Sequence, residues 1–256
     1  MRNWNCRLLS NRKIADGVWL AAFDAPKIAA AAKPGQFVHV RVPGGEHILR
    51  RPFSIHRVDG NTIKVLYRVV GAATFALSAL KAGTMLDILG PLGHGFPAIN
   101  SGRVILLAGG MGVAPLVFLA QKLGKKRGLT VILGAKSSSG VLCAAAFRET
   151  GARVIACTED GSKGKQCLAT VLLENELAQA GGKTTVCACG PNLMLKRAAA
   201  VCAQFKTPCY VSLEERMACG IGVCLCCPVP TVAGYKSACK DGPVFNALEV
   251  AWSNLK

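Results

Sequence analysis

The sequence predicts a multi-domain β and α/β protein with a small cysteine-rich segment at its C-terminal end. Three observations lead to this prediction. Short alternating segments broken by Gly and Pro fill residues 1–98, strand and helix patterns alternate through residues 99–212, and residues 213–256 hold closely spaced cysteines. The first pattern is typical of a small antiparallel barrel, and the second of a parallel sheet covered on both faces.

Length and composition favour a globular chain. Its 256 residues suffice for two core-bearing domains and an appendage. Hydrophobic residues make up 51% of the chain and charged residues 18%, the opposite of the disorder signature. The polar start of the chain has no signal-peptide pattern, so we expect reduced thiols and a cytoplasmic location. The longest apolar runs, such as Val104–Ala108, are strand-sized, so we expect no membrane span.

The first unit contains an arginine motif on an expected strand. Residues 36–42 and 62–68 alternate as strands do, and Arg51, Pro52, Phe53 and Ser54 lie between them. The rigid fork of Arg51 suits a phosphate oxygen, and a hydroxyl at Ser54, on the strand face of Pro52, can reach a polar ring edge. An exposed sheet edge is the alternative interpretation.

A helix is expected directly after the second of these strands. Gly71 begins a turn, and the apolar-periodic run ends at Leu80, with Thr74 as the expected N-cap. The free N–H groups at a helix start, next to a strand that carries an arginine, favour a pyrophosphate. We therefore expect a dinucleotide here. A capped helix that closes the barrel without a ligand is the alternative.

The second unit alternates strands and helices after a loop at residues 90–96. We expect strands at 104–108, 130–133, 153–157, 185–189 and 209–213, and helices at 116–123, 142–149, 168–180 and 192–204. Ligands of such sheets bind beyond the carboxyl ends of the strands.

Three of these strand ends carry candidate nucleotide-binding residues. Glycines at one end let a phosphate approach backbone N–H groups, although they do not complete the G-x-G-x-x-G pattern. At a second strand end, a thiol and a glycine backbone suit a flat nicotinamide. At the third, two carboxylates suit a ribose diol and favour NADH over NADPH. Lys136 and Ser137–Ser139 argue against this preference, because they are suited to bind a phosphate. For each of these groups, an ordinary turn at a strand end is the alternative interpretation. The candidates are Gly109, Gly110 and Gly112; Cys189, Gly190 and Pro191; and Glu159 and Asp160.

The C-terminal cysteines have a spacing typical of iron–sulfur proteins. Cys219, Cys224 and Cys227 follow the C-x4-C-x2-C pattern of plant-type 2Fe-2S sites, and Cys239 supplies a fourth thiol. Gly220 and Gly222 allow a short loop to wrap such a group. Zinc bound by four thiolates usually uses two C-x2-C pairs, and it remains the alternative. The pattern selects Cys227 over Cys226.

The strongly basic charge keeps a second class of function open. A net charge of +17 attracts anions of many kinds, from nucleotides to acidic proteins. A basic nucleic-acid-binding protein with a zinc knuckle is therefore the alternative from a different class, although few aromatic residues interleave the basic ones. The histidines at 39, 47, 56 and 94 have no acidic or cysteine partners in the sequence, so we expect no catalytic acid or base.

Taken together, these motifs resemble a known family over nearly the whole chain and in the same order. The family is the electron-transfer subunit of type B dihydroorotate dehydrogenase, which is similar in fold to ferredoxin reductases. The resemblance implies an antiparallel FAD-binding barrel, a parallel-sheet NAD-binding domain and a C-terminal 2Fe-2S segment. It rests on Arg51–Ser54, Tyr67–Gly71 with Thr74, Gly109–Pro115, Cys189–Pro191, Glu214–Cys224 and Cys239–Phe245.

The resemblance also implies a function and its site residues. A separate FMN-containing catalytic subunit oxidises dihydroorotate in pyrimidine biosynthesis, and electrons pass through the 2Fe-2S cluster and FAD to NAD+. A flavin is needed between them because nicotinamide exchanges two electrons and the cluster one. The implied FAD residues are Arg51, Pro52, Phe53, Ser54, Leu66, Tyr67, Arg68, Ala73 and Thr74, and the implied cluster ligands are Cys219, Cys224, Cys227 and Cys239.

Three further expectations accompany the resemblance. Ala73 stands where the family usually has glycine, and an added methyl group can crowd a pyrophosphate. The implied assembly is a heterotetramer of two electron-transfer and two catalytic subunits, without nucleic acid or membrane. A related flavin and 2Fe-2S subunit of a sulfite reductase, hydrogenase or ferredoxin-NADP reductase complex is the close alternative.

Overall fold

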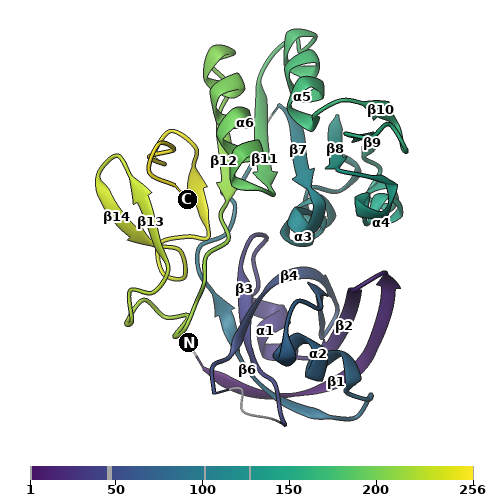
Figure 1. Cartoon of the computed structure of the whole chain (residues 1–256), viewed down its shortest axis with the longest axis vertical. Coiled ribbons are helices and arrows are strands. Elements are labelled where there is room, and N and C mark those ends of the chain that lie inside the picture. Colours follow the sequence, from purple (N-terminus) through teal and green to yellow (C-terminus); the bar gives the residue numbers. More distant parts are fainter. Residues whose placement is uncertain (1, 45–47, 101, 127, 256) are drawn as a thin grey trace.

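The N-terminal part of the chain forms a closed antiparallel barrel (Figure 1). The computed structural model describes residues 2–44, 48–100, 102–126 and 128–255. The barrel order is β1-β2-β5-β4-β3-β6, and its interior is a core of aliphatic and aromatic side chains such as Phe23 and Ile55. The strands are β1 (Asn3–Ala15), β2 (Val18–Asp24), β3 (Phe37–Arg41), β4 (Arg51–Asp59), β5 (Thr62–Arg68) and β6 (Met85–Leu92).

Two short helices accompany the barrel, α1 (Pro26–Ala31) and α2 (Ala72–Ala79). The expected helix is confirmed as α2, but the prediction of Thr74 as its N-cap was wrong. Gly71 is the N-cap and has an extended backbone, so the helix begins earlier. Thr74 lies within the first turn, where its hydroxyl accepts hydrogen bonds from the N–H groups of Val70 and Gly71 at 2.9 and 3.2 Å.

The second unit is a seven-stranded sheet in the order β10-β9-β8-β7-β11-β12-β15. All neighbouring strands are parallel except β15, which pairs antiparallel with β12 at the edge. Each expected strand is present within two residues at either end. The strands are β7 (Arg103–Gly109), β8 (Leu129–Ala135), β9 (Arg153–Thr158), β10 (Lys165–Gln166), β11 (Thr184–Cys189), β12 (Cys209–Ser212) and β15 (Val244–Asn246).

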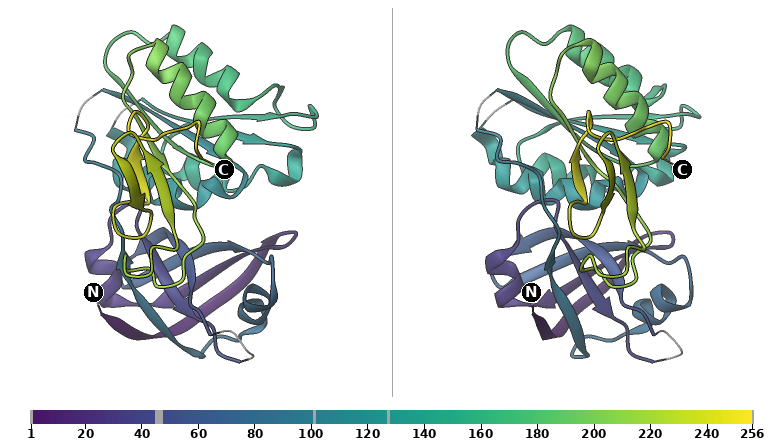
Figure 2. Two further views of the ribbon diagram at one scale, coloured as in Figure 1. Left: turned by 60° about the vertical axis from the view of Figure 1, so that its left-hand side comes forward. Right: turned by 90° about the vertical axis from the view of Figure 1, so that its left-hand side faces the viewer.

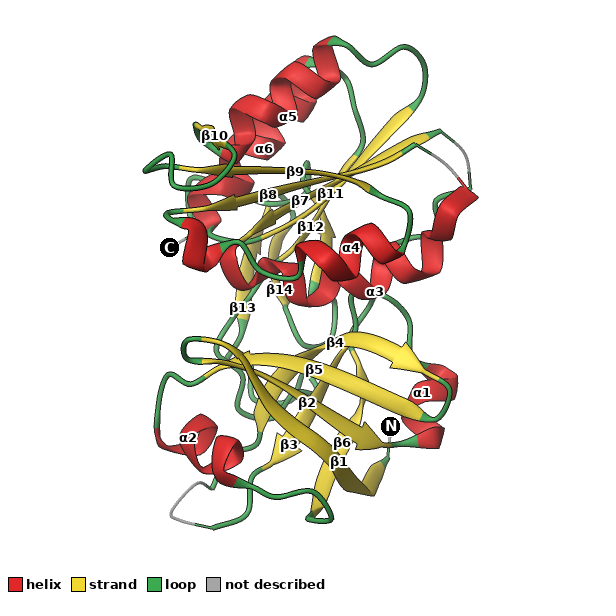
Figure 3. Cartoon of the chain, turned by 90° about the vertical axis from the view of Figure 1, so that its right-hand side faces the viewer, coloured by secondary structure: helices red, strands yellow, loops and turns green. Residues whose placement is uncertain are grey.

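Helices cover both faces of this sheet, as Figure 3 shows. Helices α5 and α6 lie on one face, while α3 and α4 lie on the other, between the sheet and the barrel. The helix expected at 116–123 begins three residues earlier, directly after a 3-10 turn, η1 (Gly110–Gly112). The α-helices are α3 (Val113–Leu123), α4 (Ala144–Glu149), α5 (Ala169–Ala178) and α6 (Asn192–Gln204), and the other 3-10 turns are η2 (Gly124–Lys126) and η3 (Ser138–Gly140).

The C-terminal segment lies alongside both preceding units (Figure 2). It consists of the cysteine loop after β12, the hairpin of β13 (Pro228–Thr231) and β14 (Gly234–Ser237), and the edge strand β15. Phe37 of the barrel shares one buried core with Cys227, Cys239 and Phe245, so the segment is packed against the barrel. None of the described helices has the length and apolar character needed to cross a bilayer.

Candidate functional site

The cysteine loop directs backbone amides at its own sulfurs. Gly222 donates to Sγ of Cys239 at 3.1 Å, Ile221 donates to Sγ of Cys219 at 3.4 Å, and Cys239 donates to Sγ of Cys227 at 3.4 Å. Burial raises the pKa of Cys219, but the amides of Ile221 and Cys224 outweigh it and lower that pKa to about 6. The amides therefore favour the thiolate of Cys219, the form in which cysteine binds metals, whereas burial raises the pKa of Cys239 to about 12.

The four cysteines of the C-x4-C-x2-C…C pattern form two neighbouring pairs. Cys224 lies within hydrogen-bond reach of Cys219, and Cys227 within reach of Cys239. Across the described residues, no three His, Cys, Asp or Glu side chains are placed to hold one metal ion together. Two pairs of thiols fit two irons better than the tetrahedron of one zinc ion. The arrangement therefore fits a 2Fe-2S cluster.

Cys226 lies apart from these pairs. Its thiol is exposed and points at the carbonyl oxygen of Arg216, at 3.7 Å. Cys227, in contrast, is buried and packs in the core shared with the barrel. Of the two adjacent thiols, the structure therefore buries only that of Cys227.

The two loop glycines are required by both backbone angle and space. Gly220 has φ +72° and Gly222 has φ +79°, a region that side chains other than glycine disfavour. A Cβ at Gly220 would lie 2.6 Å from Nδ1 of His39, and one at Gly222 would lie 2.7 Å from Cδ of Lys240. The loop thus lies directly against the barrel at His39.

The arginine motif of β4 presents two faces. Phe53 is buried in the barrel, with its ring 5.6 Å from that of Tyr67. Pro52 and Ser54 pair with His39 and Phe37 of β3 and share their outward face. Arg51, at the start of β4, donates from Nη1 to the carbonyl oxygen of Leu49 at 2.7 Å. Pro52 and Ser54 are thus the members of the motif that face out of the barrel.

The candidate residues of β5 likewise divide between inside and outside. Tyr67 points inward, because its hydroxyl donates to Oδ1 of Asn11 at 2.9 Å, and burial raises its pKa to about 12. Leu66 instead packs in the core that contains Val113 of α3, and Arg68 is exposed at the strand end. Among these residues, Tyr67 can meet a ligand through its backbone only.

Ala73 is buried beside Thr74 at the start of α2. Its methyl group is covered by protein atoms and does not project into open space, which reduces the steric conflict that the departure from glycine suggested. The first N–H groups of a helix have no acceptor within the helix, so this turn remains suited to a pyrophosphate.

The nucleotide candidates at the ends of β7 and β11 are in direct contact. A Cβ at Gly112 would lie 2.0 Å from the carbonyl oxygen of Cys189, and one at Gly109 would lie 2.7 Å from Cδ of Pro191. A Cβ at Gly190 would likewise lie 3.0 Å from the backbone of Gly109. These glycines allow two loops to meet. The thiol of Cys189 is buried, and burial raises its pKa far above the ordinary value, so it remains protonated.

Glu159 and Asp160 lie at the same sheet edge but farther along, after β9. Both are exposed, and Oδ1 of Asp160 accepts hydrogen bonds from the amide and hydroxyl of Ser162, which lower its pKa. The amide of Ser138 donates to Oγ of Ser162 at 2.7 Å. The carboxylates, which were expected to favour NADH, and the serines, which were expected to favour a phosphate, therefore belong to one surface.

The order of the barrel strands connects these sites. Strand β5 contacts η1 in the candidate nucleotide loop, Gly109–Gly112. Strand β4 lies next to β5, and β3 lies next to β4 and contacts the cysteine loop. The arginine motif is therefore flanked by the nucleotide loop on one side and by the cysteine loop on the other.

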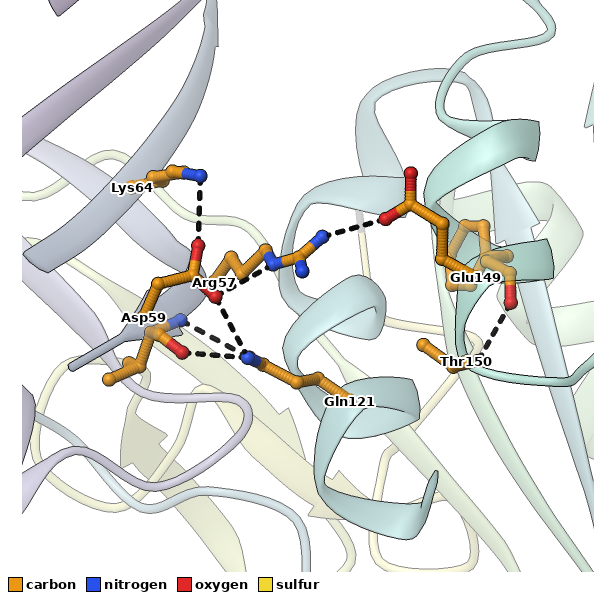
Figure 4. A network of polar contacts seen from close by, with 8 residues as sticks. Arg57, Asp59, Lys64, Gln121, Glu149 and Thr150 are labelled. Carbon is orange, nitrogen blue, oxygen red and sulfur yellow. Dashed lines mark hydrogen bonds and ion pairs between the residues drawn. The ribbon is translucent and has the colours of Figure 1, made fainter. Parts of the chain in front are cut away.

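A polar network fixes the barrel against the α/β unit (Figure 4). Gln121 of α3 donates to the carbonyl oxygen of Val58 at 2.7 Å and accepts from its amide at 3.2 Å. Arg57 of β4 forms ion pairs with Asp59 at 2.9 Å and with Glu149 of α4 at 3.1 Å. The network sets the orientation of β4 and β5 relative to the nucleotide loop.

Two residues important to this geometry were not predicted. Nδ1 of His56 donates to the carbonyl oxygen of Ala114 at 3.0 Å, and His39 lies between β4 and the cysteine loop. Burial, and then the charge of Arg50, lower the pKa of His39 to about 4. No local sequence signal identifies either contact, because the partners are far apart in the chain. His47 lies outside the described residues.

Barrel, sheet and cysteine loop together define a ferredoxin reductase-like oxidoreductase with an iron–sulfur segment. The chain superposes on the NADH-dependent reduced ferredoxin-NADP oxidoreductase with a TM-score of 0.86 and 29% identity, over 98% of this chain and 91% of that one. A ferredoxin NADP+ reductase from Neisseria gonorrhoeae shares the fold at a TM-score of 0.63 and 15% identity, over 84% and 95% of the two chains.

The sequence comparisons define the family. Residues 214–251 match the model of the iron-sulfur cluster binding domain of dihydroorotate dehydrogenase B. The dihydroorotate dehydrogenase B (NAD(+)) electron transfer subunit of Desulforamulus reducens is 40% identical over 258 residues, 97% of this chain and 98% of that one. That of Geobacillus thermodenitrificans is also 40% identical, over 95% and 96%. The chain belongs to the family of dihydroorotate dehydrogenase B electron-transfer subunits. Membership sets aside the zinc-knuckle nucleic-acid alternative.

Proposed function

We propose that this chain carries electrons from the FMN of a dihydroorotate dehydrogenase catalytic subunit to NAD+, in pyrimidine (UMP) biosynthesis. The observation that supports this most strongly is the spatial order of its motifs: cysteine loop, β3, β4, β5 and nucleotide loop follow one another across the molecule. When bound, the 2Fe-2S cluster exchanges single electrons with FAD, and FAD exchanges a hydride with NAD+.

The protein's contribution is to bind and orient these groups. The cysteine pairs and their amides hold the cluster, and hydrogen bonds to its sulfurs tune its potential. The outward face of β4 and the start of α2 hold FAD, while the network around Gln121 fixes FAD relative to the nicotinamide. The proposed ligands of the cluster are Cys219, Cys224, Cys227 and Cys239, and the proposed FAD residues are Arg51–Ser54, Leu66–Arg68, Ala73 and Thr74.

The proposed nucleotide site lies at the ends of β7, β11 and β9. The contacting loops at Gly109–Gly112 and Cys189–Pro191 receive the nicotinamide end and the phosphates. Glu159 and Asp160 receive a ribose diol, which favours NADH because two carboxylates repel a 2′-phosphate. This division corresponds to units at residues 1–98, 99–212 and 213–256.

The proposed assembly is a cytoplasmic heterotetramer of two electron-transfer and two FMN-containing catalytic subunits. Its test is co-purification from the native cell: a dihydroorotate-oxidising FMN protein should accompany the chain, and NAD+ reduction by dihydroorotate should require both. Recovery of the chain with a sulfite reductase, hydrogenase or ferredoxin-NADP reductase partner would instead assign the same chemistry to another complex. The similarity to the NADH-dependent ferredoxin-NADP oxidoreductase makes this the relevant competing outcome.

A further inference from the structure

Cys157 and Cys167 form a pair of free thiols outside the cysteine loop. Cys157, in β9, is buried, while Cys167, one residue beyond β10, is partly exposed and packs against the same core. Strand β10 pairs in parallel with β9, with Lys165 opposite Cys157, and the two thiols lie within hydrogen-bond reach of each other. Neither thiol belongs to the cluster site or the nucleotide site proposed above.

The segment between the two thiols carries the carboxylates of the proposed nucleotide site. Glu159 and Asp160 follow β9 directly, and residues 161–164 lead the chain back to β10. The segment is packed tightly against the strand, because a Cβ at Gly164 would lie 1.9 Å from the carbonyl oxygen of Ala156. A displacement at one end of so closely packed a segment is transmitted along it.

Gln166 connects Cys167 to these carboxylates. It directly precedes Cys167, and its Nε2 donates to the carbonyl oxygen of Glu159 at 3.3 Å. A Cβ at Gly161 would lie 3.2 Å from Cδ of the same glutamine. Movement of Cys167 therefore shifts the side chain that holds the backbone of Glu159.

The two thiols differ in their access to a reagent. Burial, and then the neighbouring Cys167, raise the pKa of Cys157 to about 12, so this thiol stays protonated inside the protein. Cys167 is partly exposed and lies near the exposed Lys165, whose charge attracts an anionic reagent. An incoming disulfide therefore meets Cys167 first. Cys157 is then placed to attack the mixed disulfide, and its proximity compensates for its small thiolate fraction.

We propose that Cys157 and Cys167 are a redox modification site, at which a low-molecular-weight disulfide of the glutathione type produces an intramolecular disulfide that weakens dinucleotide binding. The thiolate of Cys167 attacks one sulfur of the reagent and releases the first thiol. Cys157 then attacks the sulfur of Cys167 and releases the second. Two protein thiols are oxidised, one reagent disulfide is reduced, and the two protons pass to the released thiols. The effect on binding rests on the proposed nucleotide site.

The effect on binding follows from the length of the new bond. An S–S bond of about 2.05 Å is shorter than the contact between two free thiols, so its formation draws Cys167 towards β9. Gln166 moves with it and no longer positions the backbone of Glu159. Loss of one hydrogen bond between a well-placed carboxylate and the ribose diol corresponds to about tenfold weaker binding.

The test uses the full chain with its cofactors, kept anaerobic, before and after incubation with oxidised glutathione. Alkylation of the remaining thiols, followed by proteolysis and mass spectrometry, identifies the disulfides. Calorimetric titration with ADP-ribose measures the affinity, because this ligand contains the ribose diols of NAD but cannot exchange a hydride. Cys167→Ser removes the thiol that reacts first, and Cys143→Ser is the matched control, a partly exposed thiol of the same unit.

In the oxidised wild type we expect a disulfide that joins Cys157 to Cys167 and about tenfold weaker binding of ADP-ribose, both reversed by dithiothreitol. Cys167→Ser should form no such disulfide and should keep its affinity after incubation. Cys143→Ser should respond as the wild type does.

Three results would overturn the proposal: glutathione attached to Cys167 without a bond to Cys157, a disulfide between the two that leaves the affinity unchanged, or an equal loss of affinity in Cys167→Ser. Each of these would leave the proposed function intact. Failure of the reduced wild type to bind ADP-ribose would instead overturn the proposed nucleotide site, and the effect of the disulfide on it.

Discussion

Cys224 and Cys226 are both exposed thiols, separated by a single residue, yet they face different surroundings. Cys224 lies within reach of Cys219, whereas Cys226 points at the carbonyl oxygen of Arg216. The C-x4-C-x2-C spacing predicts Cys224 and not Cys226 as a ligand, because the pattern describes a short loop whose geometry is local. The neighbours of His39 and His56 could not be predicted in this way, since they come from residues 220 and 114.

This difference between the two cysteines gives a matched pair of variants. Cys224→Ser should reduce the iron content to near zero and abolish electron transfer to the catalytic subunit, because an iron would lose one of its thiolates. NADH oxidation by artificial acceptors should persist, since it requires only FAD. Cys226→Ser should retain iron and both activities. Partner-coupled turnover in Cys224→Ser, or iron loss in Cys226→Ser, would refute the ligand assignment.

His56 should make the stability of the chain depend on pH. Burial lowers its pKa from 6.5 to about 4, although its hydrogen bond to Ala114 opposes the shift. Between these values the unfolded chain binds more protons than the folded one, so the stabilisation is complete above pH 6.5 and is lost as the pH falls. From pH 7 to pH 5 the loss from this residue is about 2 kcal/mol.

Urea unfolding of the wild type and His56→Gln at both pH values measures this effect. The variant should be less stable at pH 7 but should lose less stability on acidification. An identical loss in both proteins would show that the pKa of His56 is the same in the folded chain as in the unfolded chain.

At the scale of elements, periodicity predicted most helices and strands, and α6 and β5 were predicted to the residue. Their patterns are local and strong. The start of α2 was mispredicted because both Gly71 and Thr74 are residue types that fit the N-cap position. Only the hydrogen bonds that the Thr74 hydroxyl accepts show that Thr74 lies inside the first turn. The edge position of β15 depends on pairing with β12 and has no sequence signature.

The contact between α3 and β4 depends more on Gln121 than on the ion pairs around it. Gln121→Ala should lower the free energy of unfolding by about 1–3 kcal/mol, because the amide and carbonyl of Val58 lose their partners in a partly buried place. It should also slow flavin reduction by NADH, since the orientation of the two units becomes less restricted. Stopped-flow absorbance at saturating NADH measures this rate.

Glu149→Gln is the control within the same network. Its side chain is 63% exposed, so loss of its ion pair with Arg57 should cost less than about 1 kcal/mol. Equal effects of the two substitutions on stability and on flavin reduction would mean that charge, and not the amide bonds to Val58, fixes the orientation.

The departure from the family at Ala73 can be tested directly. Because its methyl group is buried, Ala73→Gly should leave FAD affinity unchanged and destabilise α2 by about 0.5–1 kcal/mol. Fluorescence titration of the FAD-free chain measures the affinity, and thermal unfolding measures the stability. Markedly tighter FAD binding by the glycine variant would show that the methyl group crowds the cofactor.

At the scale of the whole molecule, the arrangement of strands turns separate motifs into one path. The sequence predicted the barrel, the parallel sheet and the cysteine loop, and the family resemblance predicted their cofactors. The order β5-β4-β3 was not predictable, because strand neighbours in a barrel are set by packing between distant segments. That order places β4, with its arginine motif, between the strand that contacts η1 and the strand that contacts the cysteine loop.

The central claim is that the paired cysteines hold a 2Fe-2S cluster next to a flavin. Chemical analysis of the full chain, purified without oxygen, tests this most directly. We expect iron and acid-labile sulfide in equal amounts, together with FAD and a yellow-brown absorption spectrum. A colourless chain that contains zinc, or one free of iron and sulfide after anaerobic reconstitution, would contradict the claim.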